Sequence, residues 1–123
     1  MDALSQTFAA LAHPTRRAIL TQLGHGQAPV QALIDELDIR GPAMTKHLIV
    51  LERSGLIRRS REAQTRPCHL EAKAIEAALT WMEELRAQTE AQFDRMEAYL
   101  RSLDQKKAKP ARKPRQKPRR KSR

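Results

Sequence analysis

The spacing of apolar residues predicts three short helices in the first part of the chain. Leu4, Phe8 and Leu11 recur at steps of three and four residues, which places them on one face of a helix. Two further apolar faces follow, and Pro or Gly residues separate them from the first and from each other. The predicted helices cover Ala3–Ala12, Thr15–Leu23 and Pro29–Leu37.

A fourth helix is predicted over Pro42–Ser54. Met44, Leu48 and Leu51 lie on one of its faces, and the opposite face carries mainly polar side chains. The short connection Asp38–Gly41 separates this helix from the third one. Two short helices joined by such a turn form a helix-turn-helix, in which the second helix commonly enters the DNA major groove.

Two short extended runs after the fourth helix predict a β-hairpin. Gly55 ends the helix, as a glycine at this position commonly does. The runs cover Leu56–Glu62 and Arg66–Leu70, and Ala63–Thr65 connects them. The predicted fold class is therefore mainly α with a small β-hairpin.

The last predicted helix, Ala72–Leu103, is longer than a domain of this size can cover. It contains no Pro or Gly, its apolar residues recur at steps of three and four, and it would reach roughly 45 Å. The surplus apolar stripe needs a partner, and a second copy in a two-fold dimer is the simplest one. The alternative is a helix folded back in two pieces around one core.

Charge divides the 123-residue chain into two parts. Residues 104–123 contain eleven Lys or Arg, one Asp and no large apolar residue, so a disordered basic tail is predicted there. Residues 1–103 form the predicted domain and are neutral overall. Within this domain, however, Arg40–Arg66 holds seven Lys or Arg against two Glu. A neutral body with one basic face indicates a directional contact with a polyanion.

This basic segment suits double-stranded DNA. Thr45 and Lys46 stand in the first turns of the fourth helix, where they can reach base edges or flanking phosphates. Arg40 is a further candidate, and Ile49 either touches a thymine methyl group or packs in the core. The hairpin arginines can contact phosphate or the minor groove, although alternation along a strand prevents all of them from facing DNA. These hairpin candidates are Arg58, Arg59, Arg61 and Arg66.

Arg16 and Arg17 stand at the start of a helix, where the helix dipole disfavours cations. The sequence leaves two roles for them, phosphate contact by one and a structural ion pair by the other, and we take Arg16 as the DNA-binding candidate. His47 lies next to the apolar face of the fourth helix, and a packed structural histidine is favoured there over a base-reading one.

The composition argues against an enzyme, a metal site or a cofactor. The sequence shows no nucleophile with a neighbouring base, no paired carboxylates in an apolar setting and no phosphate-binding loop. Cys68 and His69 are adjacent, but neighbouring side chains of one strand point to opposite faces and cannot readily chelate one ion. Because there is a single cysteine and the N-terminus resembles neither a signal peptide nor a membrane span, we expect a cytoplasmic, nucleoid-associated protein.

Several segments resemble the ArsR-type winged helix-turn-helix repressors. FAALAHPTRRAIL (Phe8–Leu20) is similar to the opening of that family. AMTKHLIVLERSGLI (Ala43–Ile57) is similar to its recognition helix and first wing strand, with Thr45 where Ser is usual. RPCHLE and FDRMEAYLRSL (Phe93–Leu103) resemble one branch that lacks the metal sites. The resemblance covers about Leu4–Leu103. It implies a winged-helix homodimer, built through the first helix and the long last helix, that represses transcription at a promoter.

The chain departs from the metal-sensing members of that family. Those members carry a Cys-x-Cys-type motif on the helix before the recognition helix, whereas the segment VQALIDEL (Val30–Leu37) has no Cys or His. Other members place His and acidic ligands on the last helix, and Ala72–Leu103 has no His. The family's metal-sensing logic therefore does not transfer to this chain.

The sequence leaves competing functions open. The first is a homodimeric repressor of an inverted-repeat operator, with two recognition helices about 34 Å apart in successive major grooves. In this hypothesis the tail adds non-specific phosphate contacts. The second is a nucleoid-type packaging protein in which the basic tail dominates. A protein-interaction module that has lost DNA binding is a third alternative.

Overall fold

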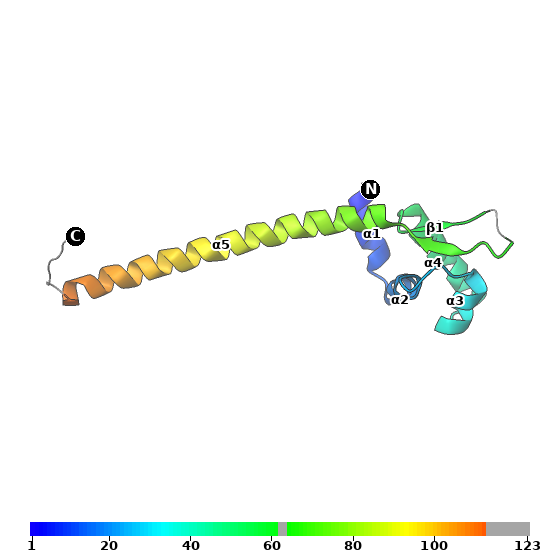
Figure 1. Ribbon diagram of the computed structural model, residues 1–123, viewed down its shortest axis with the longest axis horizontal. Helices are drawn as coiled ribbons and strands as arrows, with labels where there is room; N and C mark the ends of the chain where they lie inside the picture. The colour runs from blue at the N-terminus through cyan, green and yellow to red at the C-terminus, as the bar shows by residue number, and fades with distance from the viewer. Residues whose placement is uncertain (62–63, 113–123) are drawn as a thin grey trace. The chain divides into compact units, whose positions relative to one another are not determined.

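A computed structural model of the chain describes residues 1–61 and 64–112, with side chains described up to residue 106. The described chain folds into helices and an antiparallel two-stranded sheet (Figure 1). In chain order the elements are α1 (Ala3–Leu11), α2 (Pro14–Leu23), α3 (Val30–Leu37), α4 (Gly41–Arg53), β1 (Ile57–Arg59), β2 (Cys68–Leu70) and α5 (Ala72–Arg112). The described chain divides into two units, Met1–Met82 and a second one that begins at Glu83, and α5 contributes to both. The predicted fold class is confirmed.

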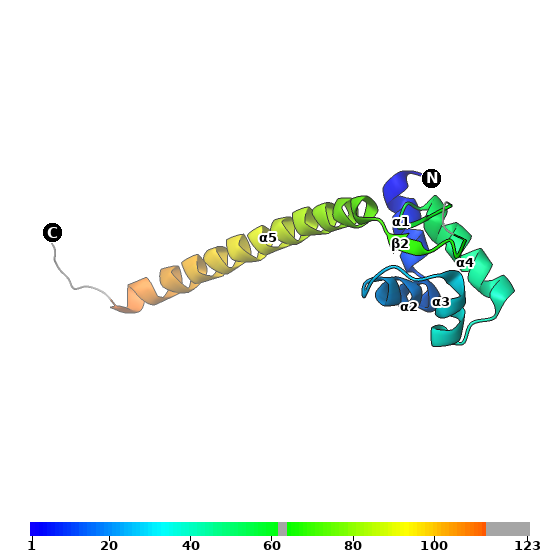
Figure 2. The same cartoon turned by 45° about the vertical axis from the view of Figure 1, so that its right-hand side comes forward.

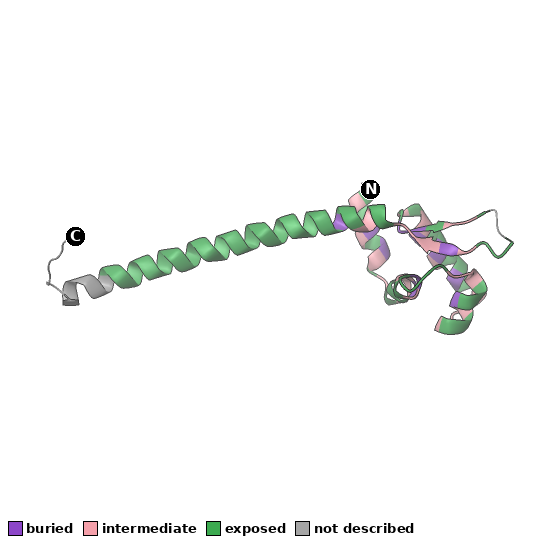
Figure 3. Ribbon diagram, in the orientation of Figure 1, coloured by how far each residue is buried: buried purple, intermediate pink, exposed green. Residues whose placement is uncertain are grey.

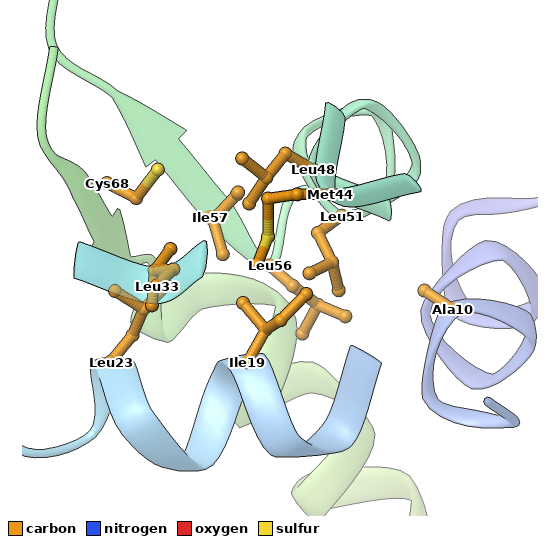
Figure 4. Close-up of a cluster of buried hydrophobic side chains, with 10 residues drawn as sticks. All are labelled: Ala10, Ile19, Leu23, Leu33, Met44, Leu48, Leu51, Leu56, Ile57 and Cys68. Carbon is orange, nitrogen blue, oxygen red and sulfur yellow. The ribbon is translucent and has the colours of Figure 1, made fainter. Parts of the chain in front are cut away.

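The first unit is built around one apolar core. Side chains from α2, α3, α4 and the hairpin point toward one another in its centre (Figure 4). The largest fully buried ones are Ile19, Leu33, Met44, Leu48, Leu51, Leu56 and Cys68. Burying a large apolar side chain contributes about 1.5–3 kcal/mol, so this cluster fixes the elements around it. Two views show α2, α3 and α4 beside one another in this unit (Figures 1 and 2).

The turn between α3 and α4 completes the predicted helix-turn-helix. Asp38 caps α3 in the left-handed conformation, with φ of 54°, which Asp tolerates better than most residues. Pro42 lies in the first turn of α4, where its missing N–H leaves no hydrogen bond unmade. α4 therefore begins at Gly41 and ends at Arg53, each one residue earlier than predicted.

The predicted stop of α4 at Gly55 is confirmed by its backbone geometry. Gly55 adopts φ of 81°, a conformation that glycine accepts without strain. The backbone N–H of Leu56 donates to the carbonyl of Leu51 at 3.0 Å, and that of Gly55 donates to the carbonyl of Glu52 at 3.1 Å. This pair of bonds is a Schellman motif, and it turns the chain from α4 into β1.

The strands of the hairpin are shorter than the predicted runs. β1 and β2 pair antiparallel, with Ile57 opposite Leu70. Arg66 adopts a positive φ of 47°, which interrupts the extended path before β2 begins. On the edge of β2 that does not pair with β1, Cys68 exchanges two backbone hydrogen bonds with Ala28, at 2.7 and 3.1 Å. That pairing ties the loop before α3 to the hairpin, and no local sequence pattern predicts it.

α5 is continuous from Ala72 to Arg112, whereas the sequence predicts a helix end at Leu103 and a disordered tail after it. The first residues of that predicted tail are mainly Gln, Lys and Ala, which are good helix formers, and this explains why the helix continues. Residues 113–123, the rest of the predicted tail, lie outside the described residues.

The second unit carries exposed apolar side chains on α5. Every described side chain from residue 83 to residue 106 is exposed (Figure 3). Its large apolar members are Leu85, Phe93, Met96, Tyr99, Leu100 and Leu103. Arg86 forms ion pairs with Glu83 at 2.6 Å and Glu90 at 3.9 Å, one helical turn away on either side. In the described part of the chain, no helix is both long and apolar enough to cross a bilayer.

Candidate nucleic-acid interface

α4 presents one buried face and one exposed face. Met44 and Leu48 are fully buried and hold the helix against the core (Figure 4). Thr45 and Lys46, between them in sequence, are exposed. Of the two roles left open for Ile49, the structure places this residue at the surface, where 37% of it is exposed. The polar candidates on this helix can therefore be reached by a ligand without unfolding it.

A hollow of about 550 Å³ lies at the start of α4. It is lined by Arg40, Pro42, Ala43 and Lys46. Arg40 is the N-cap residue, and its side chain makes no capping hydrogen bond. The first backbone N–H groups of a helix lack intrahelical partners and carry partial positive charge. Two cationic side chains at such a terminus suit a phosphate group. The sequence carries no signal for Pro42 and Ala43 as site residues, because neither has a polar side chain.

Two of the hairpin arginines pair with acids that the sequence analysis does not single out. The guanidinium of Arg58 donates to the Glu71 carboxylate at 2.9 Å. Arg61 lies 3.6 Å from the carboxylate of Glu52 on α4. Both arginines are largely exposed. Exposed ion pairs contribute only about 0.2–1 kcal/mol, so a phosphate group can compete with either acid.

The other hairpin arginines differ in exposure. Arg59 is half-buried and lies opposite Cys68 in the strand register. Arg66 is exposed in the connection before β2. β1 ends at Arg59, so strand alternation does not determine the direction of Arg61, although the sequence analysis extends the strand past that residue. The hairpin therefore offers Arg58, Arg61 and Arg66 to solvent and holds Arg59 closer to the core.

Arg16 and Arg17 both bind the C-terminal end of α1. The Arg16 side chain donates to the carbonyls of Ala10 at 2.8 Å and Ala9 at 3.2 Å. Arg17 donates to the carbonyl of Leu11 at 2.6 Å. The negative end of the α1 dipole favours these cations, which explains their position at the start of α2. Neither makes an ion pair with any residue that the structure describes, so the structural ion pair stays a prediction. Phosphate contact by Arg16 stays a prediction.

His47 is half-buried on α4 and packs against His13. Their ring centroids are 4.6 Å apart, with the planes tilted by 59°. Burial lowers the pKa of the His47 imidazole below its ordinary value, and the nearby His13 and Arg16 lower it further. This environment agrees with the predicted packed histidine rather than a base-reading one.

Cys68 is fully buried beneath the hairpin. Burial raises the pKa of its thiol, although the Arg59 guanidinium opposes this effect. A raised pKa leaves less thiolate at neutral pH, which favours the packing role over a reactive one. Among the residues that the structure describes, no three His, Cys, Asp or Glu side chains gather as a metal site requires.

Comparison with known proteins gives these features a context. A family model described as a helix-turn-helix domain matches residues 11–60. A crystal structure of an ArsR family transcriptional regulator is 37% identical, with a TM-score of 0.67 over 72% of this chain and 98% of that chain. A homodimeric winged helix-turn-helix DNA-binding domain from Mycobacterium bovis shares the fold, with a TM-score of 0.56, 20% identity and coverage of 76% and 84%.

Curated sequences agree with the structural matches. The HTH-type transcriptional repressor SmtB of Mycobacterium tuberculosis is 34% identical over 64 residues, which are 52% of this chain and 47% of SmtB. The chain thus spans about half the length of the curated relatives that it matches. The match to the ArsR family regulator covers nearly all of that protein at 37% identity. The chain belongs to the ArsR family of winged helix-turn-helix transcriptional regulators.

Proposed function

We propose that this protein is a homodimeric repressor that binds double-stranded DNA at an inverted-repeat operator and reads it with α4. The observation that carries the proposal is the two-sided character of α4. Met44, Leu48 and Leu51 are fully buried, while Thr45 and Lys46 are exposed beside them. A recognition helix needs both properties, because a firmly held helix loses little entropy when its exposed side chains meet the bases.

The remaining candidates divide into base and phosphate contacts. Thr45 and Lys46 reach base edges, and Ile49 touches a thymine methyl group. Arg40 holds a phosphate at the start of α4, with support from the free backbone N–H groups there. The hairpin arginines Arg58, Arg59, Arg61 and Arg66 contact phosphate or the adjacent minor groove, and Arg16 contacts the backbone beside α2. Arg58 and Arg61 exchange their carboxylate partners for phosphate on binding.

The dimer forms through α1 and α5. Apolar residues of α5 recur at steps of three and four, as in a helix pair, and many are exposed; Phe93, for example, is 64% exposed. Along this row of apolar positions on α5, polar side chains occupy two places, Arg86 and Thr89. A parallel pair would place the two Arg86 side chains directly opposite each other. An antiparallel pair instead places Arg86 beside Thr89 of the second copy, so charge favours the antiparallel arrangement.

The same antiparallel register pairs the apolar residues on both sides of this polar step. Met82 meets Phe93 of the second copy, and Leu79 meets Met96. These four side chains are between 52% and 64% exposed in the single chain. Covering such a row removes apolar surface from water, at about 25 cal/mol per Å². Dimerisation therefore has a driving force that the single chain leaves unused.

The basic segment at 104–123 adds contacts that do not depend on sequence. Its eleven Lys or Arg residues replace counterions on DNA phosphates, which strengthens binding at low salt. Repression itself is supported by the similarity to SmtB, a transcriptional repressor. The nucleoid-type packaging role stays the competing hypothesis, because the same tail could dominate binding.

A genome-wide footprint at several salt concentrations tests the proposal against packaging. The full chain is compared with a truncation after Arg112, which keeps every helix of the structure. We expect both proteins to protect the same few inverted repeats, with the truncated one weaker at low salt. Uniform coating of the chromosome by the full chain, with no sites protected by the truncation, would establish the packaging role instead.

A further inference from the structure

Three side chains meet where α1 ends, α2 begins and α4 passes both helices. His13 is the N-cap residue of α2, Arg16 lies in the first turn of α2, and His47 belongs to α4. The His13 and His47 rings are 4.6 Å apart between centroids. Nη1 of Arg16 lies 3.5 Å from Nδ1 of His47, while the rest of its guanidinium binds the last carbonyls of α1. This cluster is a joint between the recognition helix and the two helices behind it.

The hydrogen bonds of the joint require two neutral imidazoles. Nδ1 of His13 accepts from the backbone N–H of Thr15 at 3.2 Å and thereby caps α2. Nδ1 of His47 faces the Arg16 guanidinium, which can only donate. An imidazole nitrogen that accepts a hydrogen bond carries no proton, so each ring bears its single proton on Nε2. We assign these tautomers from the donors that surround the rings.

Among the described residues, no carboxylate forms an ion pair with this cluster. α1 contains no ionisable side chain, and the charged groups of α2 are Arg16 and Arg17. On α4, Lys46 and Arg53 are cations and Glu52 pairs with Arg61, while the acids of α3 are Asp35 and Glu36. A proton on His47 would therefore add a cation beside Arg16. In support, burial together with His13 and Arg16 lowers the pKa of His47.

We propose that His13, Arg16 and His47 form a proton-sensitive joint that loosens the recognition helix at mildly acidic pH and weakens operator binding. Protonated His47 sets two donors against each other at Arg16. This opposes the contacts that hold α4 against α1 and α2. The inference rests on the DNA binding proposed above.

Operator affinity as a function of pH tests the joint. At constant salt, we expect the dissociation constant of the unaltered protein to rise on the order of tenfold from about pH 7.5 to about pH 5.5. His47→Gln keeps an acceptor for Arg16 without a titratable ring. This variant should lose most of the pH dependence. His25→Gln, in the exposed turn after α2, is the matched control and should keep it.

The direction of the change makes the test decisive. Added positive charge by itself would strengthen binding to DNA at low pH. Affinity that rises or stays constant on acidification would therefore overturn the proposal, as would a His47→Gln variant that weakens in parallel with the unaltered protein.

A second measurement needs neither variants nor DNA. Histidine NMR across the same pH range follows the His47 ring, while amide exchange follows α4. We expect protection of the α4 amides to fall as His47 titrates, and titration with unchanged protection would overturn the proposal. Absence of operator preference at about pH 7.5 would instead count against the proposed function. The NMR experiment would still test whether protonation of His47 loosens α4.

Discussion

Thr45 and Lys46 carry most of the sequence recognition that we propose, and their surroundings suit that role. Both are exposed, whereas the neighbouring Met44 is fully buried. Replacing either side chain therefore leaves the core intact. Each contact to a base edge contributes roughly 1–3 kcal/mol of discrimination against a wrong base.

We expect Lys46→Ala to weaken binding to the selected operator by about 5- to 150-fold, the equivalent of that 1–3 kcal/mol. Thr45→Ala should relax the base preference at one position of the operator. Fluorescence anisotropy with labelled duplexes measures both effects. Lys73→Ala, an exposed lysine at the start of α5, is the charge-matched control and should bind as the unaltered protein does. Equal affinities for Lys46→Ala and Lys73→Ala would remove Lys46 from the interface.

His47 should also give the stability of the protein a pH dependence. Its pKa in the folded protein is lowered by burial and by His13 and Arg16, so the unfolded chain binds a proton more readily. The free energy of unfolding is then highest above the unfolded pKa of about 6.5 and falls as the pH drops below it. Between about pH 7.5 and about pH 5.5, urea unfolding should show a smaller loss of unfolding free energy for His47→Gln than for the unaltered protein. An equally large loss in the variant would assign the pH dependence to other groups.

Among single residues, the sequence predicts those whose role is set by their near neighbours. The buried and exposed faces of α4 follow from a spacing of three and four residues. The helix end at Gly55 follows from the left-handed backbone that this turn requires and that glycine adopts readily. The pairing of Arg58 with Glu71 joins β1 to the residue that follows β2, and the binding of α1 carbonyls by Arg16 depends on how α1 and α2 cross. Neither leaves a periodic signal in the sequence.

At the scale of elements, the helices are easier to predict than the hairpin and the end of α5. The helices have apolar residues at steps of three and four, and Pro or Gly marks several of the boundaries between the first four. The strands depend on a left-handed Arg66 and on pairing with Ala28, far away in sequence. The continuation of α5 past Leu103 depends on intrinsic helix propensity, because no large apolar residue follows Leu103. A prediction that relies on hydrophobic spacing therefore stops too early.

The antiparallel pairing of α5 can be tested by disulfide cross-linking between copies. Met82→Cys and Phe93→Cys are made as separate single variants; Cys68 can stay because it is buried. We expect oxidation of a mixture of the two variants to give a cross-linked heterodimer, since residues 82 and 93 face each other across the pair. Each variant alone should remain largely uncrosslinked. Efficient cross-linking of Phe93→Cys with itself would indicate a parallel pair and contradict the register.

At the scale of the whole molecule, charge is concentrated at the end of the chain. The net charge is +10, yet residues 1–103 are neutral overall. In the function that we propose, this separation assigns affinity and selectivity to different parts of the protein. The winged domain would supply selectivity through α4, and the basic segment would supply attraction to any duplex.

Truncation after Arg112 removes seven Lys or Arg residues and should change salt dependence more than site choice. The slope of log affinity against log salt should become shallower by about 0.9 for each phosphate that the protein no longer neutralises. Titrations at several salt concentrations, with the operator and with a scrambled duplex, measure this slope. A chain of the same length with these cations replaced by Gln separates charge from length. An unchanged slope would show that the segment does not touch DNA.

Preference of the winged domain for one DNA sequence is the property on which its proposed role depends most directly. The decisive measurement is the ratio of affinities for a selected inverted repeat and for a scrambled duplex of the same length, at one near-physiological salt concentration. We expect the full chain to prefer the inverted repeat by about 10³-fold or more, as specific DNA-binding proteins do. We expect Lys46→Ala to reduce that ratio. A ratio near one for the unaltered protein would contradict sequence-specific recognition and leave the basic segment as the source of binding.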